Sequence, residues 1–524
     1  MIQRVDSAPI LTRVPFVPPP GSDALARVPR NLAALAGIVA LGAVLRWSLL
    51  SGFRFHPDEA LYGTWARIIA TGQDPMLAGH LVDKPPLFIY ILASLFGTLG
   101  ASEEIARLPN QFAGAVALLL VYGIGLELYH TRRVALLAAA VLALSPLSIL
   151  FAPTAFTDPL MTTLLLAAIW LGLRGKLLLC GLAYGLALAT KQDAMLFAPL
   201  LLLLPFINPN AQPDTLTMRR LVRRLSCFAL GVAAPVMLVF VWSALRPQPD
   251  FLQASLANYG GFNLAAPEAY ASRALAWLPL VRTLSSDWLL LMMLVAVPLL
   301  VVRERRRVDV ILVVLALGWL SLHIVFMIPA WDRYLLPLSP LCALLVARSI
   351  AYVHDRLPSG GTKIGFDVIA AFLLILPAQA ALRNEIHVGR DYNLHAGVDQ
   401  VGQWFWAVDT TATILYDHDL SWELDYYTFG RELDRRWFVD DEQLAQDAAQ
   451  MPRARRFVAV AEWESAPGEL SAALAHEGLS IQSVFVGRRP DGSAGVTVYR
   501  ILPASVSFSG HARTLRSDFQ LTAR

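Results

Sequence analysis

Carboxylate and cationic side chains recur along the chain beside long apolar stretches. The first are Asp58 and Glu59, in the segment FRFHPDEALYGTWAR that follows the first apolar stretch. Two adjacent carboxylates at a bilayer surface are costly to desolvate, so they usually have a partner or a task, and a carboxylate can act as a general base. The later members of this set, which add cations able to bind an anion, are Asp83-Lys84, Arg107, Asp158, Lys191 and Asp332-Arg333-Tyr334.

A structural interpretation competes with chemistry at each position. An acidic pair in a loop can be solvated, and a cation at the end of a membrane span can snorkel to the interface. Asp158 can cap a helix, although Thr157 competes for that position, and Lys191 lies at a hairpin tip, where lysine is common. His323 lies late in an apolar stretch and fits a hydrogen-bonded structural histidine. The recurrence of carboxylates beside cations at the span ends favours one common site.

Composition indicates that lipid surrounds most of these elements. Of the 524 residues, 56% are hydrophobic and 16% are charged, whereas soluble domains are about 25% charged. A membrane helix needs about 20 apolar residues. The predicted spans, about eleven in an all-α polytopic bundle, are 31–50, 105–128, 133–151, 158–173, 177–190, 192–207, 226–244, 284–302, 308–328, 334–353 and 364–382.

Lysine and arginine predict the orientation, because they remain in the short cytoplasmic loops. With a cytoplasmic N-terminus, the loop 51–104 and everything after about residue 383 lie outside. The segment 85–99 is short and opens with two prolines, so we expect an interfacial helix there, with a second at 60–71; a short genuine span at 85–99 is the alternative. The inside loops then hold Arg132, Arg133, Arg174, Lys176, Arg219, Arg220, Arg223, Arg224, Arg303, Arg305, Arg306, Arg307, Arg356 and Lys363.

Domain organisation follows from the change in composition. Residues 1–30 are basic and proline-rich, which predicts a disordered cytoplasmic tail, and 31–382 form the transmembrane domain. Residues 390–505 are charged and predict a small extracytoplasmic α/β domain, followed by a tail at 506–524. No glycine-rich phosphate loop precedes a helix there. The predicted strands of this domain are 411–417, 456–461, 480–487 and 495–501, with a helix before the third.

Charge and cysteine content exclude some classes of function. The formal net charge is only +3, which argues against a nucleic-acid partner. Cys180, Cys227 and Cys342 lie far apart inside apolar runs. Neither a disulfide framework nor a metal cluster of cysteines is therefore predicted.

Five motifs carry a resemblance to a known superfamily. They are DEALY, DKPPL, ARLPN, TDPLM and WDRYLLPLSP, in this order along the chain. Together they resemble the GT-C membrane glycosyltransferases, and most closely the protein mannosyltransferases that use dolichyl-phosphate-mannose and the aminoarabinose lipid A transferases. The resemblance covers residues 31–350 well and the C-terminal domain only in its position. It implies a GT-C transmembrane catalytic domain in the plasma membrane, with a polyprenyl-phosphate sugar donor and a lipid, glycan or protein acceptor.

The resemblance also implies a task for each side chain of the set. The donor leaves as a phosphate monoester, so the leaving group needs cations, for which Lys84, Arg107 and Arg333 are the candidates. The acceptor hydroxyl must lose a proton, and Asp58 is the expected general base, with Glu59 holding either it or the acceptor. Direct attack by the acceptor would invert the anomeric centre and needs no enzyme nucleophile.

The remaining candidates have secondary roles. Asp158 is expected to orient a cation or a sugar hydroxyl, while Lys191 and Tyr334 are weaker candidates for the same site. In the lipid A transferases an acidic residue before the KPP sequence can take part in metal binding, which makes Asp83 the candidate metal ligand. The outer loop 245–283 offers no histidine to partner it. No cofactor other than a divalent metal is in question.

Three other functions compete with glycosyl transfer. A secondary transporter would carry charged or glycine-broken helices at the bilayer midplane and repeat-like halves, and no internal repeat is evident. A lipid-linked polymer ligase would share the lipid-phosphate chemistry, but the chain shows no large arginine-rich outer loop. A non-catalytic scaffold would need neither Asp58 nor Lys84.

Overall fold

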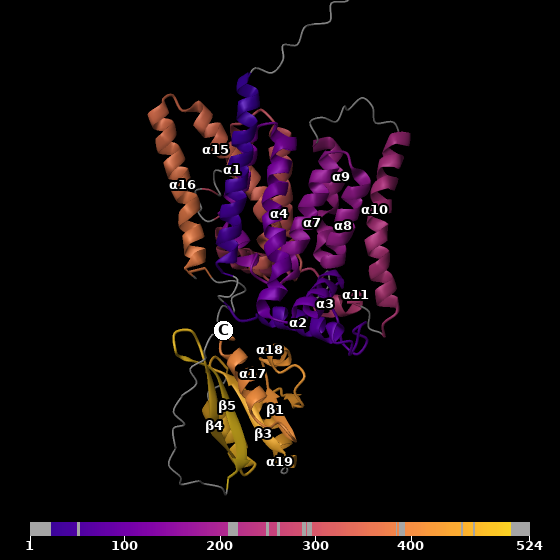
Figure 1. Ribbon diagram of the computed structural model, residues 1–524, viewed down its shortest axis with the longest axis vertical. Helices are drawn as coiled ribbons and strands as arrows, with labels where there is room; N and C mark the ends of the chain where they lie inside the picture. Colours follow the sequence, from indigo (N-terminus) through magenta and orange to yellow (C-terminus); the bar gives the residue numbers. More distant parts are fainter. Residues whose placement is uncertain are drawn as a thin grey trace, which may run out of the picture.

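The computed structural model describes residues 22–49, 53–207, 218–247, 251–258, 263–285, 290, 296–383, 385–386, 394–451, 454–464 and 467–504. A bundle of helices is followed by a small sheet domain at one end of the bundle (Figure 1). Of the predicted tails, residues 1–21 and 506–524 lie outside the described residues. The helices before the sheet domain are α1 (Ser22–Trp47), α2 (Pro57–Ala70), α3 (Leu87–Leu99), α4 (Glu103–Tyr129), α5 (Arg132–Ala143), α6 (Pro146–Phe151), α7 (Thr157–Leu173), α8 (Leu177–Thr190), η1 (Gln192–Phe197), α9 (Ala198–Ile207), α10 (Met218–Ala244), α11 (Phe251–Asn258), η3 (Pro267–Ala269), α12 (Tyr270–Ser285), α14 (Arg306–Val325), η4 (Asp332–Leu338), α15 (Ser339–Arg356) and α16 (Gly360–Leu382).

Long apolar helices make up the bundle. Shorter apolar helices, including α7 and α8, stand beside them (Figure 1). Every predicted span coincides with described helices except 284–302, most of whose first half lies outside the described residues. The count of eleven spans remains a prediction. The helices long and apolar enough to cross a membrane are Glu103–Tyr129, Val222–Ala244, Arg306–Val325, Asp332–Arg356 and Gly360–Leu382.

The predicted span 133–151 is broken into α5 and α6. Pro146 begins α6 and has no backbone N–H, so the helical hydrogen-bond ladder cannot continue through it. The guanidinium of Arg46, fully buried in α1, donates to the carbonyl oxygens of Leu142 at 3.1 Å and Ala143 at 3.3 Å. It also donates to Ser148 Oγ at 2.7 Å. A buried arginine therefore satisfies the polar groups that the break exposes.

Two short helices lie across one end of the bundle. They are α2 and α3, and α11 lies beside them (Figure 1). A capping box fixes the start of α2, in which the His56 side chain accepts from the backbone and Glu59 reaches back to the His56 N–H. The 13 residues of α3 follow Pro86 and are too short to cross a bilayer. Both helices match the segments predicted to be interfacial.

The C-terminal domain is an α/β unit with a five-stranded sheet. The strand order is β2-β1-β3-β5-β4; β1 pairs in parallel with β2 and β3, whereas β5 is antiparallel to β3 and β4. All four predicted strands are present, but β2 is not predicted, because its sequence DRRW is charged and short. The elements are α17 (Val398–Ala407), β1 (Thr413–Asp417), α18 (Ser421–Tyr427), β2 (Asp434–Trp437), α19 (Asp441–Gln450), β3 (Arg455–Ala461), α20 (Pro467–His476), β4 (Leu479–Arg488) and β5 (Ala494–Pro503).

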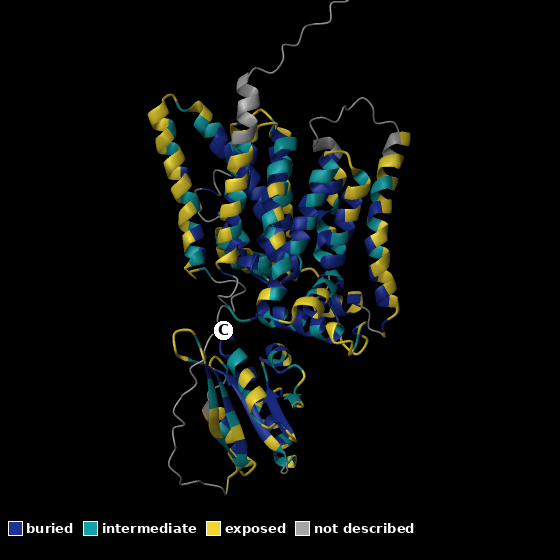
Figure 2. Cartoon of the chain, viewed as in Figure 1, coloured by how far each residue is buried: buried dark blue, intermediate teal, exposed yellow. Residues whose placement is uncertain are grey.

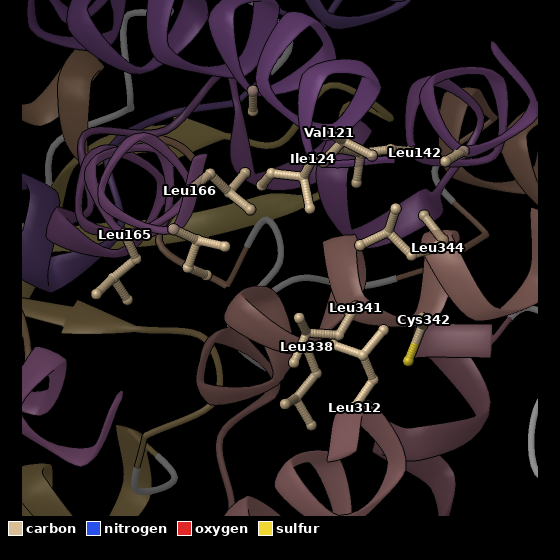
Figure 3. Close-up of a cluster of buried hydrophobic side chains, with 14 of the residues drawn as sticks. Val121, Ile124, Leu142, Leu165, Leu166, Leu312, Leu338, Leu341, Cys342 and Leu344 are labelled. Carbon is tan, nitrogen blue, oxygen red and sulfur yellow. The ribbon is translucent and has the colours of Figure 1, made fainter. Parts of the chain in front are cut away.

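The main core lies inside the bundle. It joins α4, α5, α7, α14 and α15 through aliphatic side chains, several of which are drawn in Figure 3. Exposed apolar residues instead cover the outward sides of α10 and α16, at the two edges of the bundle (Figure 2). Such a surface is costly in water and suits lipid. Burial is therefore densest between the central helices of the bundle.

Two tyrosines of α18 connect the sheet domain to α2, to Phe55 just before α2 and to Glu103 at the start of α4. The ring of Tyr426 meets that of Phe55 edge-on at 4.7 Å, and its carbonyl oxygen accepts from Arg67 at 2.6 Å. The hydroxyl of Tyr427 donates to Glu103 and accepts from the Phe55 N–H at 3.2 Å. These contacts hold the domain directly beside the segment that carries the first acidic pair.

Candidate active site

Five chain segments bring the predicted side chains together. Asp58 lies in the first turn of α2, Lys84 precedes α3, and Asp158 lies in the first turn of α7. Lys191 follows α8, and Arg333 lies in η4. All five line one or both of two cavities. The structure therefore brings these five predicted residues to two adjoining cavities.

The two cavities differ in character but share three side chains. The larger, about 1240 Å³, is bounded by α2, the turn before α3, residues 329–333 and the sheet domain. The smaller, about 230 Å³, combines apolar side chains with charged ones such as Asp158, Lys191 and Asp193. Tyr62, Lys84 and Arg333 line both, so they stand at the junction. The apolar residues of the smaller cavity are Met195, Leu196, Leu252, Leu256 and Ile328.

Asp58 is held by Arg333. Its Oδ2 accepts a hydrogen bond from Nη1 of that guanidinium. Burial by itself would raise the pKa of Asp58, but the positive charge of Arg333, aided by His56 and Lys84, outweighs it and lowers the pKa to about 2. Asp58 is therefore ionised at any physiological pH.

Lys84 is a buried cation that lies beside the carboxylate of Asp83. Its side chain is 5% exposed, and Nζ lies 2.8 Å from Oδ2 of Asp83. Burial lowers the pKa of Lys84, while Asp83 and, more weakly, Asp58 oppose that shift. The prolines that follow restrict the backbone from which this side chain extends. A cation is thus held at the junction of the two cavities.

Lys191 is more fully neutralised. Its Nζ lies 2.7 Å from Oδ1 of Asp158 and 3.0 Å from Oδ2 of Asp193. It also lies 4.6 Å from the centre of the Tyr334 ring. Asp158 thus orients a cation, one of the two tasks expected of it, and it is not the N-cap of α7, which is Phe156. Two carboxylates leave Lys191 little net charge to offer a ligand.

Glu59 and Arg107 are placed differently from the prediction. Arg107 Nε donates to Glu59 Oε1 at 3.2 Å, and Arg107 Nη1 donates to the Phe53 carbonyl at 2.9 Å. Glu59 also accepts from the backbone N–H groups of His56 at 3.0 Å and Ala155 at 2.6 Å. Neither side chain lines either cavity. This buried pair anchors the start of α2 to the bundle, because each charge needs the other.

Asp83, the candidate metal ligand, has a lysine as its close partner. Oδ2 of its carboxylate lies 2.8 Å from Nζ of Lys84. The described part of the chain contains no group of three or more His, Cys, Asp or Glu side chains that could hold a metal ion. A cage built by the protein alone needs several such ligands. The described residues therefore form no such cage around Asp83, and we derive no chemical step through a metal.

Several lining residues are not predicted from the sequence. His56 lines the large cavity, and its Nδ1 accepts from the Asp58 N–H at 3.1 Å. Tyr62 stands at the junction, and Trp331 lines the large cavity. The spacing of His56 and Tyr62 around Asp58, at the start of one short helix, is a signal in the sequence that could have identified them. Trp422 also lines this cavity and reaches it from the sheet domain.

Comparison with known proteins identifies the fold. The sequence model of the family described as dolichyl-phosphate-mannose-protein mannosyltransferase matches residues 83–242. The crystal structure of ArnT from Cupriavidus metallidurans bound to undecaprenyl phosphate has a TM-score of 0.59 at 16% identity, covering 93% of this chain and 100% of that one. The chain has the GT-C fold. The resemblance predicted from the five motifs is thus confirmed.

More distant and partial matches agree with the GT-C assignment. The archaeal oligosaccharyltransferase AglB from Archaeoglobus fulgidus, in complex with an inhibitory peptide and a dolichol-phosphate, has a TM-score of 0.55 at 13% identity, covering 93% of this chain and 75% of that one. Undecaprenyl phosphate-alpha-4-amino-4-deoxy-L-arabinose arabinosyl transferases from Erwinia tasmaniensis and Pectobacterium atrosepticum are 27% and 28% identical over 38% and 39% of this chain. These alignments span only 37% and 38% of the two relatives.

Proposed function

We propose that the chain is a membrane glycosyltransferase that moves a sugar from a polyprenyl-phosphate donor to an acceptor hydroxyl at the outer face of the membrane, with inversion. The observation that carries this proposal is the junction of the two cavities, where Lys84 and Arg333 stand beside Asp58. Cations bind a phosphate there, and a carboxylate within reach can accept a proton. The donors named for the relatives and the GT-C fold support the same assignment.

The walls of the cavities suit the parts of such a donor. The apolar side chains of the smaller cavity can contact the first isoprene units, while the phosphate lies between Lys84 and Arg333. The sugar and the acceptor then occupy the larger cavity, in which Trp331 and Trp422 offer aromatic faces. The volume of about 1240 Å³ exceeds what a drug-sized ligand needs, so both partners have room.

The reaction follows from this placement. The acceptor oxygen attacks the anomeric carbon as its proton passes to Asp58, and the bond from that carbon to the phosphate oxygen breaks. The electron pair of the broken bond stays on the phosphate, which leaves as a monoester with roughly two negative charges near neutral pH. Lys84 and Arg333 stabilise that growing charge. A single displacement without an enzyme nucleophile inverts the anomeric centre.

A transporter is the competing class, and the position of the site disfavours it. Transporter sites lie near the bilayer midplane. Asp58 and Lys84 instead belong to α2 and to the turn before α3, the helices that lie across one end of the bundle (Figure 1). Measured uptake of a sugar by vesicles, without formation of a glycosylated product, would favour the transporter.

The proposed topology has its own test. In a variant without Cys180, Cys227 and Cys342, Pro490→Cys lies on an exposed turn of the sheet domain and is expected to react with an impermeant maleimide in intact cells. Arg303→Cys, in a loop predicted to be cytoplasmic, serves as the control and should react only after permeabilisation. The reverse pattern would place the sheet domain in the cytoplasm and overturn the outer-face assignment.

The buried lysine gives an expected pH dependence. Binding of undecaprenyl phosphate needs protonated Lys84, whose pKa is lowered by burial, so affinity is present at lower pH and lost as pH rises through that pKa. Lys84→Arg should retain affinity to higher pH, because a guanidinium does not deprotonate in proteins. Dissociation constants measured above pH 8, where the phosphate monoester is fully ionised, should separate the two curves. If the two curves coincide, a group other than Lys84 causes the loss of affinity at high pH.

A further inference from the structure

The expected base is not free in the ligand-free chain. Oδ2 of Asp58 accepts a hydrogen bond from Arg333, so one of the two oxygens that could take the acceptor's proton already holds a hydrogen from a cation. The low pKa of Asp58 has the same cause and marks a carboxylate that accepts protons poorly. A general base works best when its pKa lies near the working pH. Something must therefore loosen this ion pair before Asp58 can act.

Arg333 is placed to change partners. Its side chain is 12% exposed, and its Nε is buried without a hydrogen-bond partner among the described residues. A buried donor without a partner is costly, and a bidentate anion could use Nε and a terminal nitrogen together. By contrast, Lys191 has two carboxylates within 3.0 Å, and Arg107 contacts both Glu59 and Glu103. Arg333 thus combines an incomplete set of partners with a position at the cavity junction.

We propose that the donor's phosphate releases the base by taking Arg333 from Asp58. The proposal rests on the function proposed above, because the anion that arrives is the phosphodiester of the polyprenyl-phosphate sugar donor, whose phosphate group undecaprenyl phosphate supplies in the binding test. Lys84 holds a second phosphate oxygen, so the incoming anion meets two cations while Asp58 offers Arg333 one carboxylate. Once free of Arg333, Asp58 faces the large cavity, which it already lines. Asp58 can then accept the proton of the acceptor only after the donor is bound.

This exchange makes a prediction that simple catalysis does not. Asp58 and the phosphate compete for one guanidinium. Breaking the Asp58–Arg333 pair therefore offsets part of the free energy of phosphate binding and lowers the apparent affinity. Asp58→Asn removes the competitor, and it should bind undecaprenyl phosphate about 10-fold more tightly than the wild type. Asp399→Asn is the matched control, because its carboxylate lies 3.7 Å from Arg54 and lines neither cavity. The control should bind close to wild type.

A double-mutant cycle separates exchange from a general loss of negative charge. Dissociation constants for undecaprenyl phosphate are measured for the wild type, Asp58→Asn, Arg333→Ala and the double variant, each monodisperse and with its thermal unfolding recorded. The gain from Asp58→Asn should vanish in the Arg333→Ala background, since no guanidinium remains to be freed. A gain that persists there, or affinity in Asp58→Asn no higher than wild type, overturns the exchange. Absence of binding in the wild type would instead refute the donor class in the proposed function, and the exchange with it.

Discussion

Replacing Asp58 by asparagine is expected to lower turnover by about 10² to 10⁴, the usual share of general-base catalysis. Asparagine keeps the size of the side chain and the contact surface in the large cavity, but its amide cannot take the proton of the acceptor hydroxyl. The helix cap at His56 uses the backbone N–H of Asp58, which the substitution leaves in place. Single-turnover transfer with saturating donor is the appropriate measurement, because it isolates the chemical step.

A second acidic residue of the same cavity provides the control. Asp425 lines the large cavity from the sheet domain, where it pairs with Arg435. Asp425→Asn removes the same charge from the same cavity, but Asp425 pairs with Arg435 and does not line the smaller cavity, so turnover should stay near wild type. Wild-type turnover in Asp58→Asn, under conditions in which chemistry limits the rate, would remove Asp58 from the mechanism.

Removing either junction cation should cost about 2 to 4 kcal/mol in kcat/KM, the usual range for an electrostatic donor. Lys84→Ala and Arg333→Ala each take away a charge that faces the leaving phosphate. Because negative charge grows on that phosphate as the glycosidic bond breaks, each cation stabilises the transition state more than the bound donor. Turnover as well as affinity should therefore fall, which separate measurement of kcat and KM will resolve.

The geometry of Arg333 refines this expectation. Arg333→Lys keeps the charge but loses the planar fork, so it should recover only part of the loss. Arg54→Ala is a charge-matched control: Arg54 lies beside Glu103 and Asp399 and lines neither cavity. Normal kcat/KM in both Lys84→Ala and Arg333→Ala, with Arg54→Ala also normal, would make these cations interfacial anchors and place the phosphate elsewhere.

The sequence is informative about the site where the signal is local. Asp58, Lys84 and Arg333 can be predicted because each lies beside the end of an apolar stretch, and the ends on one side of a bundle must meet. Which of the cations remain available to a ligand depends on contacts between residues that are distant in the sequence. Arg107 pairs with Glu59, 48 positions earlier in the chain. Lys191 pairs with Asp158, 33 positions earlier. Such pairings depend on the rotation of packed helices, which a single sequence does not reveal.

The sheet domain also combines features that can be predicted from local sequence with features that depend on tertiary contacts. Its strands β1, β3, β4 and β5 are predictable because apolar and β-branched residues recur in them, whereas β2 has charged residues and little burial. The docking of the domain cannot be predicted from sequence. Tyr427 reaches Phe55 across 372 positions of the chain, and Trp422 enters the large cavity only because α18 lies against α2. The role of this domain as a wall of the site is a result of the tertiary fold alone.

The central claim is best tested by sugar transfer itself. Membranes that contain the wild-type protein or Asp58→Asn in equal amounts are given a panel of radiolabelled hexosyl and pentosyl polyprenyl phosphates, and label is followed in lipid, glycan and protein fractions. We predict that at least one donor labels an acceptor in wild-type membranes, and that Asp58→Asn membranes lose nearly all of this product. Equal product in both membranes, or no transfer from any donor by the wild type, would contradict the account.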